Sequence, residues 1–402
     1  MSSQLTNQLQ QLEPGQANYA STFVENLLSA ALASDASDIH CQPTREGLAI
    51  SWRIDGVLQP LGVFPPGDPT DVVTRLKVLS GLLTYRTDIP QEGRLSQASI
   101  HETDMRVSTF PTLYGERAVV RIFAVKQKLL FLEQLGLGES TRSRLANSAS
   151  ETSGAILITG PAGSGKTTTA YACLRHIVNH APGRSIVSME DPIEVPVEGV
   201  AQSQTNETAG FDLQSGLKSL LRQDPEVMFV GEMRDEKTAS IALQASLTGQ
   251  LVVTTFHAGS CVEALSRLLN MNIEPYVITS GVLEIVCQRL VRRLCECAIR
   301  ATNTSELLGL DVQQAYLANG CDRCHNTGYT GRIVLTEMTS LAPPLLADAV
   351  LKRADSSALS SKAKQSGMQT LWTSAVSAVD NKITSPQEIR RVFGFRSNDE
   401  MK

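Results

Sequence analysis

Hydrophobic residues in the middle of the chain fall into four short runs, at residues 155–159 (AILIT), 185–189 (SIVSM), 227–230 (VMFV) and 251–256 (LVVTTF). Polar or Gly-rich turns bound each run, and stretches long enough for a helix separate the runs. Buried runs that alternate with helices are typical of a parallel sheet covered on both faces. The pattern therefore predicts an α/β fold with a parallel-rich sheet.

The first third of the chain has a different pattern. Thr22 and Glu25 have the spacing of a capping box, and apolar residues follow them at helical spacing up to Leu32. Strand-like runs come next, at residues 48–53, 105–109 and 118–123. We expect a flexible lead-in over residues 1–20, a smaller α+β domain over 21–128, a linker over 129–146 and the larger domain over 147–402. A length of 402 residues suits two or three domains.

Charge and composition exclude several classes of protein. The chain carries 36 basic and 41 acidic residues, a net charge of −5, so we expect no direct binding of nucleic acid, which requires a basic surface. With 42% hydrophobic residues the chain is not disordered. No apolar run reaches the length of a membrane span, and the first residues do not resemble a secretory signal. We therefore expect a cytoplasmic protein whose eight cysteines are thiols or metal ligands.

Each of the four apolar runs ends in residues capable of chemistry. A Gly-rich turn leading to Lys166 follows the first run, Glu190 and Asp191 follow the second, Glu232 the third and His257 the fourth. In open α/β sheets, ligands bind beyond the carboxyl ends of the strands. The four ends therefore predict one shared site.

The turn after the first run has the pattern of a phosphate-binding loop. Residues 160–167 (GPAGSGKT) satisfy G-x-x-x-x-G-K-[ST] and lie between an expected strand and a helical stretch at 168–180. Backbone N–H groups of such a loop surround phosphates, and the helix N-terminus favours negative charge. We expect Lys166 to reach the β- and γ-phosphates of ATP and Thr167 to bind Mg²⁺. The expected nucleotide-binding residues are Gly160, Pro161, Ala162, Gly163, Ser164, Gly165, Lys166, Thr167 and Thr168.

The remaining strand ends supply candidate catalytic groups. Glu232 can orient or deprotonate the attacking water, since phosphoryl transfer needs mainly positioning and charge neutralisation. Glu190, Asp191 and Glu194 lie in MEDPIE (189–194), where a carboxylate such as Asp191 can hold Mg²⁺ through water. His257 is a candidate contact of the γ-phosphate. The alternative is that these residues are a solvated strand end and an acidic surface turn.

From residue 36 to 392 the chain resembles the secretion ATPase family of the GspE/PulE/PilB type, which serves type II secretion and type IV pilus assembly. The resemblance rests on ASDIHCQP (36–43), RIDGVL (53–58), QEGR (91–94), RVSTFPTLYGERAVVRI (106–122), MEDPIE (189–194), SLLRQDPEVMFVGEMRD (219–235) and LTGQLVVTTFHAGS (247–260). It implies a RecA-like P-loop NTPase core after a smaller N-terminal α+β domain. The last three segments resemble the family's aspartate box, Walker B region and histidine box.

The resemblance further implies a homohexameric ring whose nucleotide sites are completed by arginines of the N-terminal domain. Arg94 and Arg106 are the first candidates, followed by Arg117 and Arg121; the alternative for each is a surface salt bridge. The implied function is a cytoplasmic ATPase motor, peripheral at the inner face of the cytoplasmic membrane, that acts on a membrane platform protein to assemble pilin or pseudopilin subunits.

The chain departs from the family's pattern at two places. The usual His after the Gly of the histidine box is Gln250, so His257 alone would serve. Members devoted to type II secretion generally begin with a further domain that docks on a membrane-anchored partner. Since about 20 unpatterned residues precede Thr22, we expect a chain without that domain, which docks by another surface or through another protein.

Four cysteines, Cys295, Cys297, Cys321 and Cys324, lie between an expected helix at residues 288–294 and a turn at 326–331. Assembly-type relatives carry a zinc knuckle here, and thiolates can bind Zn²⁺ tetrahedrally. The first pair is C-x-C instead of C-x-x-C, so His325 or Cys287 are alternative ligands, and reduced free thiols are the other alternative. From residue 337 to 402 we expect a helical tail, and Cys41, Cys173 and Cys261 are expected core residues.

Other functions remain open at this point. Pilus retraction is the nearest alternative, but retraction members usually lack the cysteines. Related motors that handle DNA are disfavoured by the acidic charge. A third alternative is an adaptor that binds ATP without hydrolysing it, against which Lys166, Thr167 and Glu232 argue.

Overall fold

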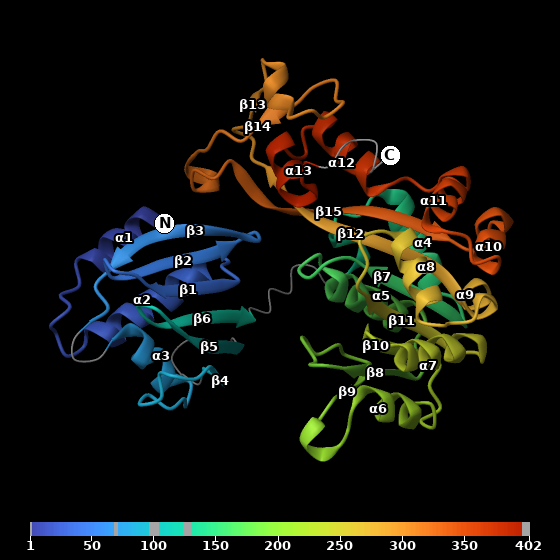
Figure 1. Cartoon of the computed structure of the whole chain (residues 1–402), viewed down its shortest axis with the longest axis horizontal. Helices are drawn as coiled ribbons and strands as arrows, with labels where there is room; N and C mark the ends of the chain where they lie inside the picture. The colour runs from blue at the N-terminus through green and yellow to red at the C-terminus, as the bar shows by residue number, and fades with distance from the viewer. Residues whose placement is uncertain (1, 68–70, 96–103, 124–130, 396–402) are drawn as a thin grey trace. The chain divides into compact units, whose positions relative to one another are not determined.

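The structure, a computed structural model, describes residues 2–67, 71–95, 104–123 and 131–395. The chain divides into two compact units, Met1–Lys126 and Gln127–Lys402 (Figure 1). The division falls close to the domain end expected at residue 128. No helix among the described residues combines the length and apolarity that crossing a bilayer requires.

The first unit is an antiparallel sheet with helices packed against it. Its elements are α1 (Ser2–Gln10), α2 (Tyr19–Ala33), β1 (Asp38–Pro43), β2 (Leu48–Ile54), β3 (Val57–Phe64), α3 (Val72–Leu79), β4 (Gln91–Arg94), β5 (Asp104–Thr112) and β6 (Gly115–Phe123). The strands lie in the order β3-β2-β1-β6-β5-β4. Ile39, Ile50 and Val120 alternate with more exposed residues and are buried with Leu28 of α2 in one core. The expected α+β domain is confirmed.

The start of the first unit differs from the expectation. The flexible lead-in predicted for residues 1–20 is wrong for residues 2–10, which form α1. Leu5 and Leu9, four residues apart, are 3% and 1% exposed and pack into the core of this unit. Helix α2 begins at Tyr19 instead of Thr22, because Tyr19 is itself buried and its hydroxyl donates to the Pro65 carbonyl at 2.6 Å.

The second unit contains the elements from residue 132 onward. Up to the end of the third crossover they are η1 (Leu132–Gln134), α4 (Glu139–Ala149), β7 (Gly154–Thr159), α5 (Lys166–His180), β8 (Ile186–Glu190), β9 (Ala201–Gln204), η2 (Glu207–Ala209), α6 (Leu213–Leu220), β10 (Val227–Met233), α7 (Glu236–Leu247) and β11 (Leu251–Phe256). They continue with α8 (Cys261–Asn270), α9 (Pro275–Gly281), β12 (Val282–Leu294), β13 (Ile299–Arg300), η3 (Thr304–Leu307), β14 (Tyr316–Leu317), η4 (Asp322–Cys324), β15 (Tyr329–Ser340), α10 (Pro344–Leu351), α11 (Ser356–Gln365), α12 (Leu371–Asp380) and α13 (Pro386–Phe393).

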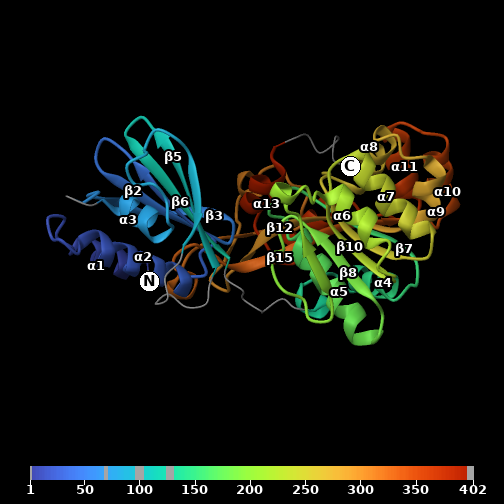
Figure 2. The same ribbon diagram turned by 90° about the horizontal axis from the view of Figure 1, so that it is seen from below.

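The main sheet has the strand order β15-β12-β7-β11-β10-β8-β9 and is parallel except for β15. Successive residues of a strand point to opposite faces. Ile156 accordingly packs with α4 and α5, while its neighbour Leu157 packs with α7 and α8. Figure 2 shows α4 and α5 on one side of the sheet and α7 and α8 on the other. All four predicted apolar runs are strands of this sheet, and the predicted α/β fold is confirmed.

Three expectations for the second unit are wrong. Residues 131–146 of the expected linker belong to the second unit, because Leu145 of α4 is fully buried against the sheet. Residues 288–294, expected as a helix, are the second half of strand β12 and pair with β15, while residues 282–287 of the same strand pair with β7. The helical tail begins at Pro344, since residues 337–340 end β15.

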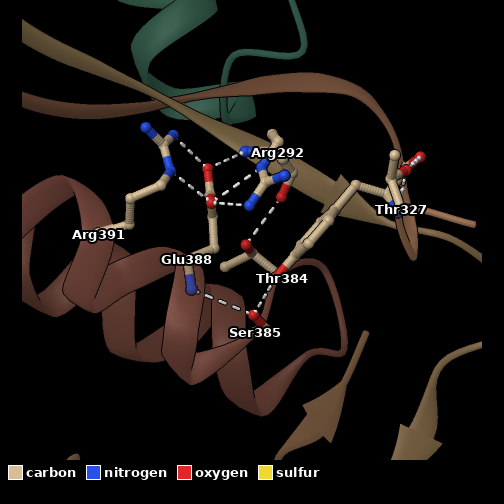
Figure 3. Close-up of polar contacts among 7 residues, drawn as sticks. Arg292, Thr327, Thr384, Ser385, Glu388 and Arg391 are labelled. Carbon is tan, nitrogen blue, oxygen red and sulfur yellow. Dashed lines mark hydrogen bonds and ion pairs between the residues drawn. The ribbon is translucent and has the colours of Figure 1, made fainter. Parts of the chain in front are cut away.

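Helix α13 is attached to β12 by a buried carboxylate. Glu388 accepts hydrogen bonds from the backbone N–H and guanidinium of Arg292 at 2.8–3.0 Å and from the guanidinium of Arg391 at 2.6 and 2.8 Å (Figure 3). Burial favours the protonated form of Glu388, but the arginine bonds outweigh this and lower its pKa. The Thr384 hydroxyl donates to the Arg292 carbonyl at 2.8 Å. These bonds hold α13 beside the strand that leads to the cysteine cluster.

Candidate nucleotide-binding site

The phosphate loop, residues 160–167, connects β7 to α5 as predicted. Gly160 and Gly165 have φ values of 149° and 85°, which only glycine adopts readily. The Lys166 amino group donates to the carbonyls of Gly160 and Pro161 at 3.0 and 3.1 Å, and is therefore folded back over the loop. Burial lowers the pKa of Lys166. A phosphate would supply a stronger acceptor than these carbonyls.

One cavity of about 260 Å³ collects the residues from the four strand ends. Its lining includes Ala162, Gly163, Lys166, Thr167, Glu190, Asp191, Glu194, Glu232, Arg234 and His257. The sequence predicted that the residues after the four apolar runs share one site, and the ends of β7, β8, β10 and β11 do meet at this cavity. Thr168 lies in the first turn of α5 and is exposed outside this lining.

Glu232 lies near the end of β10 and contacts a nitrogen group on each side. Its Oε1 lies 2.6 Å from Nε2 of His257, and its Oε2 accepts a hydrogen bond from Nε of Arg234. Arg234 also lies within 4.0 Å of Asp191. The Glu232 side chain is 18% exposed, so it is accessible from the cavity while its orientation is restricted.

Glu190, at the end of β8, is more deeply buried than expected of a residue that meets a ligand. Its side chain accepts hydrogen bonds from the hydroxyls of Tyr171 and Ser188 at 2.5 and 2.6 Å and from the amide of Gln202 at 2.9 Å. The residue is 2% exposed. In this arrangement both oxygens of Glu190 are occupied by protein donors.

Oxygen donors suited to Mg²⁺ lie at the edge of the cavity. The Thr167 hydroxyl donates to Glu194 at 3.1 Å, and burial raises the pKa of Glu194. Asp191 accepts from the Thr205 hydroxyl at 2.9 Å. Since Mg²⁺ prefers carboxylate, hydroxyl and water oxygens, this donor set fits the ion. The expected binding of Mg²⁺ by Thr167 and by a carboxylate of residues 189–194 such as Asp191 stays a prediction; of these carboxylates, Glu194 contacts Thr167 in the structure.

Three residues of the site were not singled out from the sequence. Arg234 had a signal, a basic residue two positions after the strand-end carboxylate. Tyr171 and Gln288 had no such signal, because each contacts a residue distant in sequence. The Tyr171 hydroxyl donates to Glu190, and Nε2 of Gln288 donates to the carbonyl oxygen of Ser164 in the phosphate loop at 2.8 Å.

The four candidate arginines belong to the first unit, and three of them form a row across its sheet. Arg94 of β4 is opposite Arg106 of β5, which is opposite Arg121 of β6, which in turn is opposite Asp38 of β1. Arg94 pairs with Asp104 at 2.7 Å, and Arg121 with Asp38 at 3.0 Å.

Like charges directly opposite in a sheet repel each other, and the Asp104 and Asp38 carboxylates offset this repulsion at Arg94 and Arg121. Both arginines thus form the surface salt bridges that were the alternative. Arg106 instead lies over the ring of Phe123, 5.1 Å from its centre. The remaining candidate, Arg117, contacts Nδ1 of His40 at 2.9 Å. A role of these arginines at a nucleotide stays a prediction.

The four predicted cysteines form one cluster between β12 and β15. The Sγ–Sγ distances are 3.8 Å for Cys295–Cys321, 3.8 Å for Cys297–Cys324 and 3.7 Å for Cys321–Cys324, and all four sulfurs lie within 4.8 Å of one another. A tetrahedral site with Zn–S bonds of about 2.3 Å has edges of about 3.8 Å. The cluster therefore fits zinc despite its C-x-C pair.

The alternative ligands are not part of this cluster. Cys287 is buried on β12, and its thiol donates to the Ala258 carbonyl at 3.8 Å. Among the described residues, His325 does not join the group of converging cysteines.

A parallel sheet with a phosphate loop after one strand and a carboxylate after another defines a RecA-like P-loop NTPase core. A family model described as "Type II/IV secretion system protein" matches residues 15–391, and the chain belongs to this family.

Among curated relatives, the type IV pilus assembly ATPase PilB of Thermus thermophilus is 35% identical over 380 residues, which cover 92% of this chain and 42% of PilB. The type II secretion system protein E of Aeromonas hydrophila is 41% identical over 324 residues, which cover 79% of this chain and 64% of that protein. The chain thus spans about half the length of these relatives. The ATPase DotB of Legionella pneumophila shares the fold, with a TM-score of 0.66, 18% identity, and coverage of 94% of this chain and 97% of DotB.

Proposed function

We propose that this chain hydrolyses ATP to ADP and phosphate, and that it is the motor subunit of a type II secretion or type IV pilus assembly machine. The observation that carries the proposal is the single cavity that unites the phosphate loop with Glu232, His257 and the carboxylates after β8. The names of the relatives, an assembly ATPase and a secretion protein, support the same reading.

The residues divide the chemistry among them. The phosphate loop and the N-terminus of α5 receive the phosphates, with Lys166 turning from its own loop carbonyls to the β- and γ-phosphate oxygens. Glu232 orients the attacking water and accepts its proton, while the water oxygen bonds to the γ-phosphorus and the bond to the β-phosphate oxygen breaks. His257 contacts Glu232 and restricts where its carboxylate points.

Magnesium, when bound, neutralises charge on the β- and γ-phosphate oxygens. Thr167 would bind it directly, and Asp191 and Glu194 through water. Glu190, with both oxygens already hydrogen-bonded, would position the turn that carries Asp191.

The machine itself is proposed on family grounds. The active assembly is a homohexamer in which arginines of the N-terminal domains complete the nucleotide sites. It is a peripheral protein at the cytoplasmic face of the inner membrane. Its partner is the membrane platform protein of the machine, through which it drives pilin or pseudopilin assembly. Pilin-like and platform genes beside the coding sequence would support this pathway, and their replacement by conjugation genes would contradict it.

Phosphate release tests the hydrolysis. We expect Glu232→Gln to lower the rate by about 10²-fold or more while ATP still binds, because a positioned base contributes about 10²–10⁴-fold. Glu226→Gln is the matched control, since Glu226 lies just before the start of β10, at the other end of the strand from Glu232, and outside the cavity. Binding of ATP by the wild type with no phosphate release would instead identify a nucleotide-binding adaptor.

We also propose that the cysteine cluster binds Zn²⁺, with Cys295, Cys297, Cys321 and Cys324 as thiolate ligands. The sulfur distances support this, and the segment they enclose has a second reason to need a metal. Its regular elements are two strands of two residues each and short 3₁₀ turns. A segment with so little regular structure is stabilised effectively by a bound ion.

A further inference from the structure

Strand β12 contacts the phosphate loop through the side chain of Gln288, which has no part in the proposed chemistry. Gln288 is 1% exposed, and its Nε2 donates to the carbonyl of Ser164 at 2.8 Å. Its Oε1 accepts from the hydroxyl of Thr169 at 3.1 Å. One amide thus connects a carbonyl of the loop with the first turn of α5, using both its donor and its acceptor.

The loop is also packed closely on the backbone of the same residue. A Cβ atom at Gly160 would lie 2.6 Å from the carbonyl oxygen of Gln288, and one at Gly165 would lie 3.3 Å from its Nε2. Real Cβ atoms do not approach oxygen to 2.6 Å. The glycine at position 160 is therefore required by the contact with β12 as well as by its own φ angle.

The residues on either side of Gln288 contact the loop that follows His257. The Arg289 guanidinium donates to the carbonyl of Gly259 at 3.1 Å, and the Cys287 thiol to that of Ala258 at 3.8 Å. Three consecutive residues of β12 therefore contact the phosphate loop and the loop that follows His257. Figure 1 shows β12 next to β7, from which the phosphate loop begins.

We propose that Gln288 is a positioning residue for the phosphate loop: its side-chain amide keeps the loop in the conformation that receives phosphate. The inference rests on the proposed binding of ATP. If the loop is already ordered before ATP binds, none of the binding free energy is lost in ordering it, and the affinity is higher. Without the amide, the Ser164 carbonyl and the Thr169 hydroxyl lose buried partners and the loop can leave the strand.

Nucleotide affinity tests the proposal. Methionine matches the length of glutamine and can make neither hydrogen bond, so we expect Gln288→Met to raise the Kd for a non-hydrolysable ATP analogue with Mg²⁺ by about tenfold. Thr169→Val removes one of the two bonds and leaves Gln288 in place, so its Kd should rise by a smaller factor. Titration of the full chain and thermal denaturation are measured on each variant.

Thr384→Val is the matched control. Its hydroxyl is buried and donates to the carbonyl of Arg292, which lies further along the same strand than Gln288 (Figure 3). A role of Gln288 in stability alone predicts that Gln288→Met and Thr384→Val both melt earlier and bind the analogue as the wild type does, and this result would overturn the proposal.

If Gln288→Met does not fold, the test rests on Thr169→Val: a folded Thr169→Val that binds the analogue with the wild-type Kd would also overturn the proposal. Failure of the wild type to bind the analogue would refute the proposed function, which distinguishes the two failures.

Discussion

The imidazole Nε2 of His257 lies 2.6 Å from Oε1 of Glu232, across the ends of two neighbouring strands. The other carboxylate oxygen contacts Arg234, so the carboxylate is restricted on both sides. A base that must reach one proton of one water gains from such restriction, because misplacement by about 1 Å can cost about 10²-fold in rate.

We therefore expect His257→Ala to lower phosphate release by about 10²-fold. In the double variant with Glu232→Gln, the two losses should be less than additive, since His257 acts through Glu232. The rates of the two single variants and the double variant give the coupling. His180→Ala, at the exposed end of α5, is the control and should release phosphate at the wild-type rate. Full additivity would mean that His257 acts on the substrate independently.

Arg94→Ala and Arg106→Ala should each lower ATP hydrolysis by about 10²-fold or more with nucleotide binding retained, because arginines at a transferring phosphoryl group contribute about 10³–10⁵-fold. Arg45→Ala, which removes an arginine that contacts Tyr114 at 2.8 Å in the same unit, should leave hydrolysis unchanged. Unchanged turnover in both Arg94→Ala and Arg106→Ala would remove these residues from the mechanism.

Protein purified without chelator should contain about one zinc ion per chain, measured by elemental analysis. Cys297→Ser should lose most of the metal, because a hydroxyl is a poor replacement for a thiolate ligand. Cys41→Ala, a buried cysteine of the first unit, should retain it. Absence of stoichiometric zinc from the wild type would show that the cluster consists of free thiols.

The ion pair at Glu388 predicts a pH-dependent stability. A carboxylate whose pKa is lowered by folding stabilises the fold above its unfolded pKa, and this contribution is lost as the pH falls through the folded value. Glu388→Gln should therefore lower the free energy of unfolding by about 2 kcal/mol at neutral pH, because it removes the buried carboxylate that accepts the charged hydrogen bonds of Arg292 and Arg391. Below about pH 4 the gap to the wild type should narrow.

Urea denaturation measures that gap, with Trp372 as the probe of the second unit in a Trp52→Phe background, since the chain has two tryptophans. Glu274→Gln is the control, because its pair with Arg353 is exposed and 3.8 Å long. A gap between Glu388→Gln and the wild type that stays constant from neutral to acidic pH would contradict the assigned pKa direction.

Local signals were sufficient for the core of the second unit. Each predicted strand is an apolar run that ends in a polar residue, and the rule that ligands bind at the carboxyl ends of parallel strands brought Lys166, Glu232 and His257 to one cavity. The cysteine cluster was predictable for a similar reason, since four thiols within 30 residues have few ways to be used.

Long-range contacts were not visible in the same way. Residues 288–294 have apolar side chains at Leu290, Val291 and Leu294, a spacing compatible with a helix. Their strand conformation depends on pairing with β15, which comes from a distant part of the chain. Leu5 and Leu9 looked isolated in a polar segment, but the sheet of the first unit provides the apolar surface that they cover.

The order of residues thus established the fold class, the phosphate loop and the reactive strand ends, because periodicity and motif spacing are properties of short segments. Folding decided that Glu190 is enclosed by Tyr171, that Glu232 meets His257, and that Gln288 contacts Ser164 across 124 positions of sequence. Such pairings depend on which strands become neighbours in the sheet, and that choice is made by burying the whole core rather than by any one segment.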